Sequence, residues 1–392
     1  MLPSESKLHY LFEPNNGVKP EEINTDVYVI QMYHKIGFFF GLTCIGKNSR
    51  PTVWNIISNV LFSLTASFAS VFSLSNRIDN EWRISRPSLI ILEFVELVLE
   101  WLWMVLCFVG ASSNIKHWNS LFLDIDGVDR ILKHDGGLSK ATALKHIILL
   151  VFFVIVYCLL HYFEIFMWDL QFRMEAGYVF YRIIMLYQFF IVLFSINLTR
   201  LLHARYEIVL GSLSEIISGE YAIIQANYGS CKTLVEMKEA MLRLHNVIQK
   251  YNVIFGWLIF LNTISAFLAS LGDIDYVLLY YGTGDSYFNY GIIAANLVYV
   301  LAYSISTILI VFSCDKVNKT ARKIVILCYL KPGLLNKTPI RDDLVSFVQF
   351  AEKLLPNFSA AGFFYINQTI LSTLFSAIST YLIIIIQFNS AL

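Results

Sequence analysis

Hydrophobic residues along this chain gather in seven blocks, each about as long as a membrane crossing. A helix needs roughly 20 mostly apolar residues to cross the ~30 Å hydrocarbon core of a bilayer. The blocks cover residues 54–74, 88–110, 146–168, 178–202, 251–272, 291–313 and 359–388. The pattern predicts an all-α membrane protein with seven transmembrane helices.

The last block is longer than one crossing requires. Its beginning contains Gly362, Asn367 and Gln368, and the uninterrupted apolar stretch starts near Thr369. We therefore predict a helix whose first part is a cytosolic foot and whose remaining ~20 residues cross the membrane.

Two connections between the blocks repeat apolar residues at the three- and four-residue spacing of an amphipathic helix. The first repeat is Leu234, Met237, Met241, Leu244, Ile248 and Tyr251, and the second is Leu344, Phe347, Val348, Ala351 and Leu355, ended by Pro356. Such stripes are buried either within one subunit or between subunits. They predict that the helices extend below the membrane into a cytosolic bundle.

The predicted organisation follows from these blocks. It comprises a cytosolic N-terminal segment (1–53), helices one to four with the first cytosolic loop (54–202), a cytosolic helical connection (203–250), helices five and six (251–313), a second cytosolic helical connection (314–358), and the last helix with a short extracellular tail (359–392).

Composition agrees with a membrane location. Hydrophobic residues make up 57% of the chain and charged residues 15%, whereas soluble domains carry roughly 25% charged residues. The formal net charge is zero and no basic run stands out, which argues against a nucleic-acid partner. Membrane lipid is the partner that the composition implies.

Orientation follows from the positive charges, because Lys and Arg near transmembrane helices stay on the cytoplasmic side. Of the 29 Lys and Arg residues, 24 lie in the N-terminal segment or in the connections after the second, fourth and sixth blocks, counting Arg200 at the end of the fourth. The N-terminus is therefore predicted inside and the C-terminus outside.

Other classes of membrane protein fit less well. A G-protein-coupled receptor has the opposite orientation, and its Asn-Pro-x-x-Tyr pattern is missing from the last block; Asp129-Arg130 is the nearest match to a receptor-type acidic-Arg pair. No repeated half suggests a secondary transporter. The six cysteines show no metal spacing, and no nucleophile–base pair or phosphate loop is visible, so neither an enzyme nor a cofactor is predicted.

The end of the last block carries a motif: Thr380-Tyr381, five hydrophobic residues, then Gln387-Phe388. Upstream, residues 361–366 read Ala-Gly-Phe-Phe-Tyr-Ile. Both resemble the C-terminal signature of the insect gustatory receptors, a family within the insect chemoreceptor superfamily. The resemblance implies a tastant-gated, non-selective cation channel in the plasma membrane of sensory neurons. It also implies a homotetramer, or a heteromer with related receptors, around a pore lined by the last helix.

The resemblance places the gate around Gln387 and Phe388, with an apolar residue about one turn inward. The residues agree with that placement, because Thr380, Ile384 and Gln387 share one helix face. A ring of Gln387 amides would offer ions polar oxygens, and a ring of Ile384 or Ile383 would form a dewetting constriction. The alternative is that Gln387 only hydrogen-bonds water at the headgroup interface.

Polar residues inside the blocks are costly in lipid, so they face a cavity or a partner. The candidates in blocks two to six are Glu93, Glu96, Glu100, His161, Glu164, Tyr178, Arg182, Asn262, Asn296 and Tyr299. They are expected either to line one outward-opening ligand pocket, where the resembled family binds tastants, or to pair internally, for example Arg182 with Glu164 or Glu93.

The class of ligand follows from one departure from the family pattern. Leu382 follows Thr380-Tyr381, whereas many sugar-sensing members have an acidic residue there. The resemblance therefore favours a bitter or other non-sugar compound and a place outside the main sugar-receptor group. A fructose- or sugar-type taste channel is the alternative.

Overall fold

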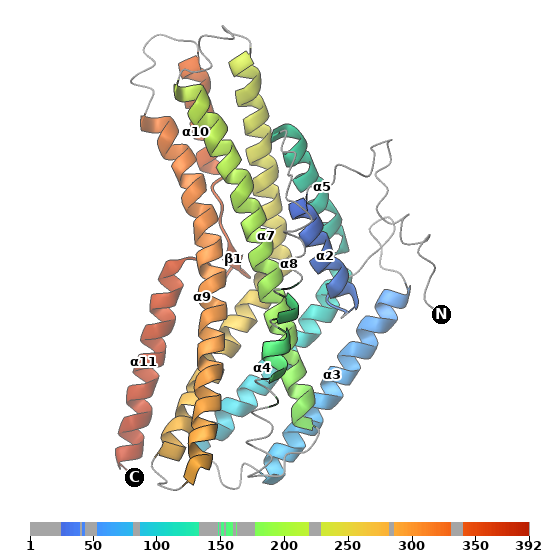
Figure 1. Ribbon diagram of the computed structural model, residues 1–392, viewed down its shortest axis with the longest axis vertical. Helices are drawn as coiled ribbons and strands as arrows, with labels where there is room; N and C mark the ends of the chain where they lie inside the picture. Colours follow the sequence, from blue (N-terminus) through green and yellow to red (C-terminus); the bar gives the residue numbers. More distant parts are fainter. Residues whose placement is uncertain are drawn as a thin grey trace.

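The computed structural model describes residues 25–39, 41–43, 53–80, 87–132, 148, 150–152, 154–159, 162, 177–218, 229–281, 286–330 and 340–391. Its named helices (Figure 1) are α2 (Thr25–Phe39), α3 (Val53–Asn80), α4 (Pro87–Ser113), α5 (Ile115–Leu132), α7 (Gly177–Ser218), α8 (Gly229–Tyr281), α9 (Ser286–Leu330), α10 (Ile340–Lys353) and α11 (Gln368–Ala391). An antiparallel hairpin of β1 (Ser359–Ala360) and β2 (Phe364–Tyr365) separates the last two helices.

Three long helices, α7, α8 and α9, form the centre of the molecule (Figure 1). They contain 42, 53 and 45 residues, so at 1.5 Å per residue each is about 60–80 Å long, roughly twice the hydrocarbon thickness. Stretches long and apolar enough to cross a membrane lie at Leu186–Ile217, Leu234–Asp275 and Asn296–Tyr329, and shorter apolar helices at Ile56–Thr65, Leu150–Leu159 and Gln368–Ile384. The prediction of helices that extend well beyond one crossing is confirmed.

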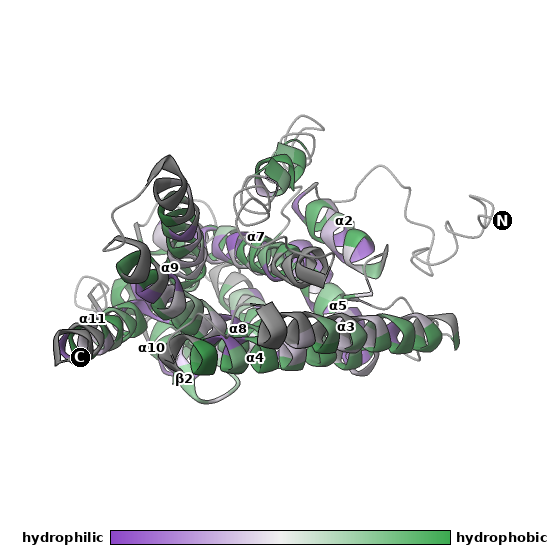
Figure 2. Ribbon diagram, turned by 90° about the horizontal axis from the view of Figure 1, so that it is seen from below, coloured by the Kyte–Doolittle hydropathy of each residue, from purple (hydrophilic) through white to green (hydrophobic). Residues whose placement is uncertain are grey.

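Large apolar side chains also cover the outside of the lower half of the molecule. On α3, Leu64 and Phe68 are 62% and 74% exposed, and on α9 Leu301 is 59% exposed. Figure 2 shows hydrophobic residues along the outer sides of α3 and α4. A surface of this kind is costly in water and suits contact with lipid.

The two predicted amphipathic stripes are helical and face inward. All six apolar residues of the first stripe, on α8, are buried, and so are Leu344, Phe347, Val348 and Ala351 of α10. Leu355, the last residue of the second predicted stripe, lies beyond the end of α10 at Lys353 and is half-buried. Because α10 packs against α8 and α9, these stripes are covered within one subunit. Burial between subunits, the other alternative for these stripes, is therefore not needed to explain their apolar residues.

Two helices, α2 and α5, had not been predicted. One face of α5 carries the buried residues Ile115, Trp118, Leu121, Ile125 and Val128, at three- and four-residue spacing. The Trp118 ring stacks on Phe194 of α7 at 5.1 Å and meets Phe255 of α8 edge-on at 5.7 Å. The periodic signal for α5 was present in the sequence, but many polar residues surround it.

A buried ion pair holds α5 to its neighbours. Arg205 of α7, whose side chain is 1% exposed, pairs with Asp129 of α5 and with Asp26 of α2. Arg130 pairs with Asp126 on the surface of α5. Asp129 and Arg130 therefore do not act together as a receptor-type acidic-Arg pair. Asp129 has a buried partner, whereas Arg130 has a partner on the surface.

The last block differs from the prediction. The helix expected to begin at residue 359 begins at Gln368, and residues 359–367 contain the β-hairpin in place of a helical foot. At the turn, Ala361 and Gly362 have φ values of 52° and 82°. This left-handed conformation does not occur within an α-helix, and glycine adopts it readily. The helical-foot prediction is wrong because this turn separates α10 from α11.

Candidate functional site

The C-terminal helix α11 lies at one edge of the molecule and packs against α8 and α9 (Figure 1). Its side chains are exposed in several directions: Phe375 is 73% exposed, Ile383 55% and Ile384 43%. Thr380 and Gln387 are exposed as well. An apolar helix with so little cover needs lipid, another subunit or a pore beside it.

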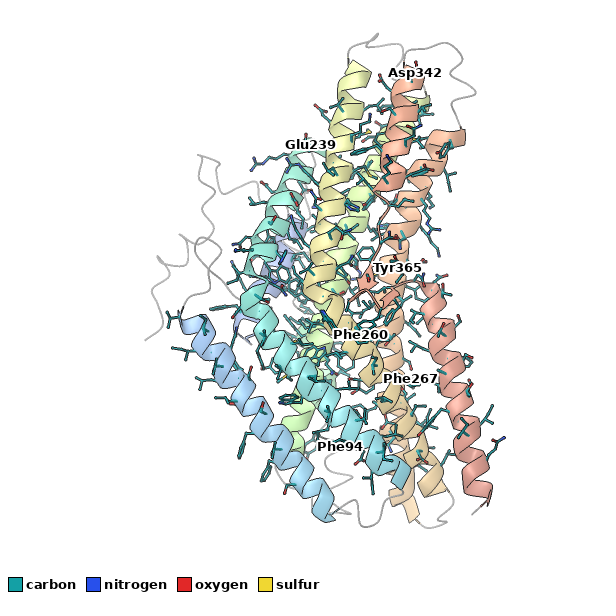
Figure 3. All side chains as sticks on the ribbon, turned by 180° about the vertical axis from the view of Figure 1, so that it is seen from behind. Phe94, Glu239, Phe260, Phe267, Asp342 and Tyr365 are labelled. Carbon is teal, nitrogen blue, oxygen red and sulfur yellow. The ribbon has the colours of Figure 1, made fainter. Side chains whose placement is uncertain are left out.

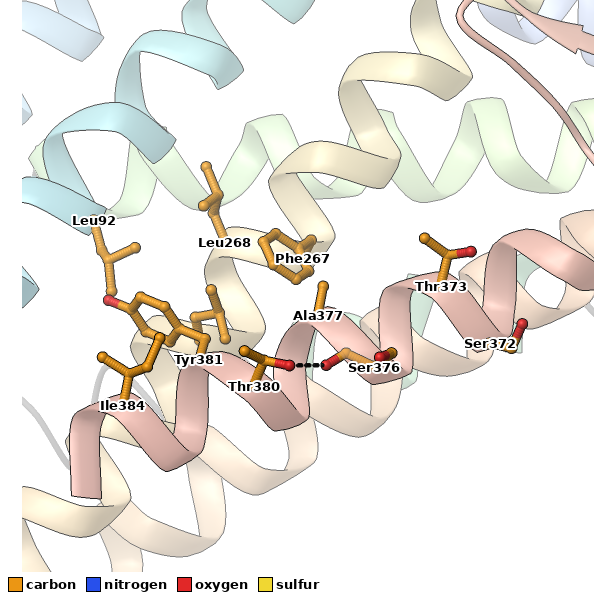
Figure 4. Close-up of a pocket in the computed structure, with 11 residues that line it drawn as sticks. Leu92, Phe267, Leu268, Ser372, Thr373, Ser376, Ala377, Thr380, Tyr381 and Ile384 are labelled. Atoms are coloured by element: carbon orange, nitrogen blue, oxygen red, sulfur yellow. Dashed lines mark hydrogen bonds between the residues drawn. The ribbon is translucent and has the colours of Figure 1, made fainter. Parts of the chain in front are cut away.

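A groove of about 840 Å³ runs between α11 and α8 (Figure 4). From α8 it is lined by Phe267, Leu268 and Leu271, with Leu92 of α4 at one end, and from α11 by Ser372, Thr373, Ser376, Ala377, Thr380, Tyr381 and Ile384. The α11 hydroxyls bond to their own helix, as Thr380 Oγ1 donates to the Ser376 carbonyl at 2.9 Å and Thr373 Oγ1 to the Thr369 carbonyl at 3.1 Å. Because these donors are satisfied locally, this face is stable against either lipid or water.

The structure places the predicted gate residues as follows. Thr380 and Ile384 line the same groove, which agrees with the predicted shared face. Ile383 is exposed and is not among the lining residues, and Gln387 is exposed towards the end of α11. Nothing is described for the Phe388 side chain. Of the two candidate isoleucines, Ile384 is the one that lies on the Thr380 face.

The hairpin that leads into α11 is fixed on α8. Asn252 Nδ2 donates to the Asn357 carbonyl at 2.8 Å, and the Ser359 amide donates to Asn252 Oδ1 at 3.0 Å. A Cβ added to Gly256 would lie 3.0 Å from the Ala361 amide nitrogen and 3.1 Å from the Ser359 oxygen. The hairpin backbone therefore passes directly over α8 at this glycine.

Aromatic rings complete the docking of the hairpin. Phe363 stacks on Phe260 of α8, with ring centroids 4.4 Å apart, and Trp257 meets Phe363 edge-on at 5.7 Å. Figure 3 shows the hairpin, marked by Tyr365, beside the segment of α8 marked by Phe260. The Ala-Gly-Phe-Phe-Tyr-Ile motif is visible in the sequence, but the surface of α8 on which it docks is not. No local pattern connects residues about 100 positions apart.

The candidate ligand-binding residues that the structure describes are largely buried. Glu93 is 7% and Glu100 0% exposed on α4, and Asn262, Asn296 and Tyr299 of α8 and α9 are 4–5% exposed. Glu96 is half-buried. Each of the three glutamates takes part in a hydrogen bond, ion pair, ring contact or electrostatic interaction, and both the pocket and internal pairing stay predictions for them.

Tyr299 belongs to a separate aromatic cluster between the helices. In it, Phe189 of α7 stacks on Tyr303 of α9 at 6.3 Å and meets Tyr157 edge-on at 5.7 Å. Beside Phe189, Gln188 is 2% exposed, and Ser265 of α8 is 1% exposed. Of these two polar residues, Ser265 stands out in the sequence as a polar residue within the fifth block, whereas no pattern in the sequence pointed to Gln188.

Three buried polar side chains, each within one helical turn of a cluster member along α7, α8 or α9, have unused hydrogen-bonding groups. Within the described part of the chain, the Gln188 amide, the Ser265 hydroxyl and the Asn296 Nδ2 have no hydrogen-bond partner. Buried polar groups are normally paired, and leaving one unpaired costs on the order of 1–3 kcal/mol. The cluster therefore suits a neutral ligand or water that supplies the missing partners. No group of His, Cys, Asp and Glu among the described residues is arranged to hold a metal ion.

The model of the family described as 7tm chemosensory receptor matches residues 30–392. The chain belongs to this family. The resemblance drawn from Thr380, Tyr381, Gln387 and Phe388 is confirmed for the insect chemoreceptor superfamily.

The fold of this chemosensory receptor is that of a seven-helix insect receptor. The structure of the insect olfactory receptor OR5 from Machilis hrabei matches with a TM-score of 0.56 and 12% identity, over 92% of this chain and 97% of that chain. The structure of the same receptor in complex with eugenol matches with a TM-score of 0.57 and 14% identity, over 93% and 99%. Identity this low shows the fold alone. A comparison with curated proteins found no significant match.

The remaining pocket candidates of the receptor lie at the limits of the described structure. Tyr178 and Arg182 occupy the first turns of α7, and their side chains are not described. His161 and Glu164 lie outside the described residues. The predicted pairing of Arg182 with Glu164 or Glu93 stays a prediction.

Proposed function

We propose that this chemosensory receptor is a tastant-gated, non-selective cation channel whose pore is lined by α11. The observation that carries the proposal is the exposed α11 itself. It bears the Thr380-Tyr381 and Gln387-Phe388 signature and leaves Thr380 and Ile384 uncovered in a groove. A hydroxyl-bearing, otherwise apolar face is what a gated cation pore with a dewetting constriction requires.

Assembly follows from the same helix. The exposed side chains of α11 are covered when several copies surround a common axis, so we propose a homotetramer or a heteromer with related receptors. We further propose that the N-terminus is cytoplasmic and that the receptor lies in the plasma membrane of sensory neurons, on the charge distribution and the gustatory signature. A tag at the C-terminus of intact cells should then be labelled without permeabilisation; labelling only after permeabilisation would contradict this orientation.

The ligand is proposed to bind among α7, α8 and α9 at the polar–aromatic cluster of Gln188, Ser265, Asn296 and their neighbouring rings. The unpaired neutral groups support an uncharged ligand with both donors and acceptors. The eugenol complex of OR5 supports a small organic molecule as the class. Leu382 after the Thr-Tyr pair supports a bitter or other non-sugar compound, with a fructose- or sugar-type ligand as the alternative.

The channel proposal is tested by recording currents from cells that express the receptor, with G-protein signalling blocked and a panel of bitter compounds applied. We expect a direct cation current, and we expect Gln387→Glu to raise the calcium-to-sodium permeability ratio, because a ring of carboxylates favours the divalent ion. Phe375→Leu, an exposed position on the same helix, should leave the ratio unchanged. Identical ratios in the Gln387→Glu and unmodified receptors at equal surface expression would contradict a pore role for this residue.

A further inference from the structure

A second cavity lies where α4 ends and α5 begins. It has a volume of about 180 Å³. The two helices meet at an angle at Asn114 (Figure 3), and helical hydrogen bonds continue through the bend: the Asn114 amide donates to the Gly110 carbonyl and the Trp118 amide to the Asn114 carbonyl, both at 2.9 Å. These hydrogen bonds hold the bend in one conformation. The cavity lies between the bend and α8.

Neighbouring elements form the other sides, and the cavity is partly open to the outside of the molecule, where its lining residues Val109 and Trp257 are 59% and 49% exposed. Residues 253–258 of α8, Ile191 of α7 and the turn at Leu42 and Thr43 supply these walls. Trp103 Nε1 donates to the Leu258 carbonyl at 3.1 Å, which fixes α4 to α8. Thr43 Oγ1 donates to the His34 carbonyl at 2.6 Å, which fixes the turn to α2. The helices and the turn that line the cavity are therefore held to their neighbours by hydrogen bonds.

The lining indicates what the cavity can hold. Aromatic rings of Trp118, Phe255 and Trp257 form part of it, and none of the described lining residues is charged. An ion would lie there among uncharged, mostly apolar groups, which disfavours it relative to a neutral molecule. The side chain of Asn114 lines the cavity and has no hydrogen-bond partner among the described residues, so it offers one donor group and one acceptor group to an occupant.

We propose that this cavity is a second binding site, for an uncharged single-ring aromatic molecule that carries one hydroxyl group. An apolar cavity of about 150 Å³ already binds benzene, so about 180 Å³ leaves room for a ring and a short polar substituent. The ring would pack against the aromatic lining, and the hydroxyl would bond to the Asn114 amide.

The site is distinct from the polar–aromatic cluster proposed for the tastant. Along α8 the two are centred about 12 residues apart, at 253–258 and 265–269, which is about 17 Å along the helix. The proposal stands on the cavity alone and does not require the receptor to be a channel.

The cavity adjoins the hairpin that leads into α11. Trp257 lines the cavity and also meets Phe363 of the hairpin at 5.7 Å. An occupant that packs on Trp257 therefore restricts a side chain on which the hairpin rests. The expected role of this site is modulation of α11 by a molecule other than the tastant.

The test uses the full-length receptor in lipid nanodiscs and a phenol that bears a diazirine at the meta position. On irradiation the diazirine loses N₂, and the resulting carbene inserts into a nearby bond, so that mass spectrometry locates the label. We expect label in residues 106–118 and 253–258, and we expect an excess of benzyl alcohol to suppress it. Label that benzyl alcohol does not suppress, or label spread evenly over the lipid-facing surface of α4, would overturn the proposal.

A cavity-filling variant adds a matched control. A Cβ on Gly110 would meet Asn114 Nδ2 at 3.5 Å and no other described atom within 4 Å, so Gly110→Leu fits the helix and fills the cavity. It should reduce labelling of these segments by about tenfold or more, as expected when a bound molecule is excluded sterically. Val98→Leu, on the exposed side of α4, should label like the unmodified receptor. Equal labelling of the Gly110→Leu and Val98→Leu variants would place the probe outside the cavity.

Discussion

Arg205 of α7 and Asp129 of α5 form a buried bidentate ion pair. Arg205 Nε donates to Asp129 Oδ1 at 2.9 Å and Nη2 donates to Oδ2 at 3.0 Å, while Nη1 donates to Asp26 Oδ2 of α2 at 2.9 Å. One guanidinium therefore joins three helices, two of which had not been predicted. Bidentate geometry of this kind is specific to arginine.

Removing this guanidinium should destabilise the receptor strongly. Arg205→Met removes the guanidinium that pairs with the two largely buried carboxylates of Asp26 and Asp129, and breaking a buried pair in this way costs about 3 kcal/mol or more. Thermal unfolding of the detergent-solubilised receptor, followed by fluorescence-detected size exclusion, measures the change. Arg130→Met is the matched control, because Arg130 pairs with Asp126 at the surface and its removal should cost less than ~1 kcal/mol. Restored stability on adding Asp26→Asn and Asp129→Asn to Arg205→Met would identify the lost charge compensation as the cause; no restoration would contradict it.

The imidazole of His34 predicts a pH dependence of stability. The ring is 4% exposed between Trp118 and Phe122, with centroids 4.9 and 5.6 Å away, and neither nitrogen has a hydrogen-bond partner in the described part of the chain. Burial, with a smaller contribution from Lys35, lowers the His34 pKa from 6.5 to about 4. As the pH falls through this range the unfolded chain takes up the proton first, so stability is fully present above about pH 6.5 and decreases towards pH 4.

Replacing His34 should remove this dependence. His34→Leu eliminates a buried polar group without a partner and should raise the unfolding free energy at neutral pH by about 1 kcal/mol. It should also flatten the decline between pH 6.5 and 4, measured as unfolding midpoints across that range. His117→Leu, at a partly exposed position on α5, should keep the decline. An unchanged pH profile in His34→Leu would assign the dependence to other groups.

Docking of the hairpin on α8 predicts a position-specific effect of adding one methyl group. In Gly256→Ala the new Cβ meets hairpin backbone at 3.0 and 3.1 Å, and backbone cannot rotate away as a side chain can. We expect a loss of about 1–3 kcal/mol and a smaller ligand-evoked current. Gly211→Ala, in α7, meets no described atom within 4 Å and should be neutral or slightly stabilising, since alanine favours helix. Equal currents in the two variants would show that hairpin docking does not affect α11.

The two candidate gate isoleucines can be separated. Ile384 shares the groove with Thr380, whereas Ile383 does not line it. If Ile384 forms the dewetting constriction, Ile384→Ala should produce a cation leak without ligand, and Ile383→Ala should not. Whole-cell currents in the absence of ligand, normalised to surface expression, measure this. A leak in Ile383→Ala alone would assign the constriction to Ile383 and contradict a gate at Ile384.

The sequence by itself determined those features that depend on local spacing. Blocks of about 20 apolar residues, the stripe from Leu234 to Tyr251 and the stripe from Leu344 to Ala351 predicted the helices, because a helix repeats every 3.6 residues and brings such residues to one face. The signature at the end of the chain predicted the family. The resemblance also placed the gate, with which the helical spacing of Thr380, Ile384 and Gln387 agreed, and the pocket candidates were named as polar residues inside apolar blocks; the roles of all these residues remain predictions.

The tertiary structure decided what depends on partners distant in the chain. Arg205 pairs with residues 76 and 179 positions away, and these contacts join α2 and the polar helix α5 to α7. Residues 359–367 form a hairpin rather than a helix because Gly256 and Asn252 of α8, about 100 residues earlier, leave space and hydrogen bonds for it. Local periodicity specifies a helix and its buried face, but it carries no information about which distant residue completes a buried charge or supports a turn.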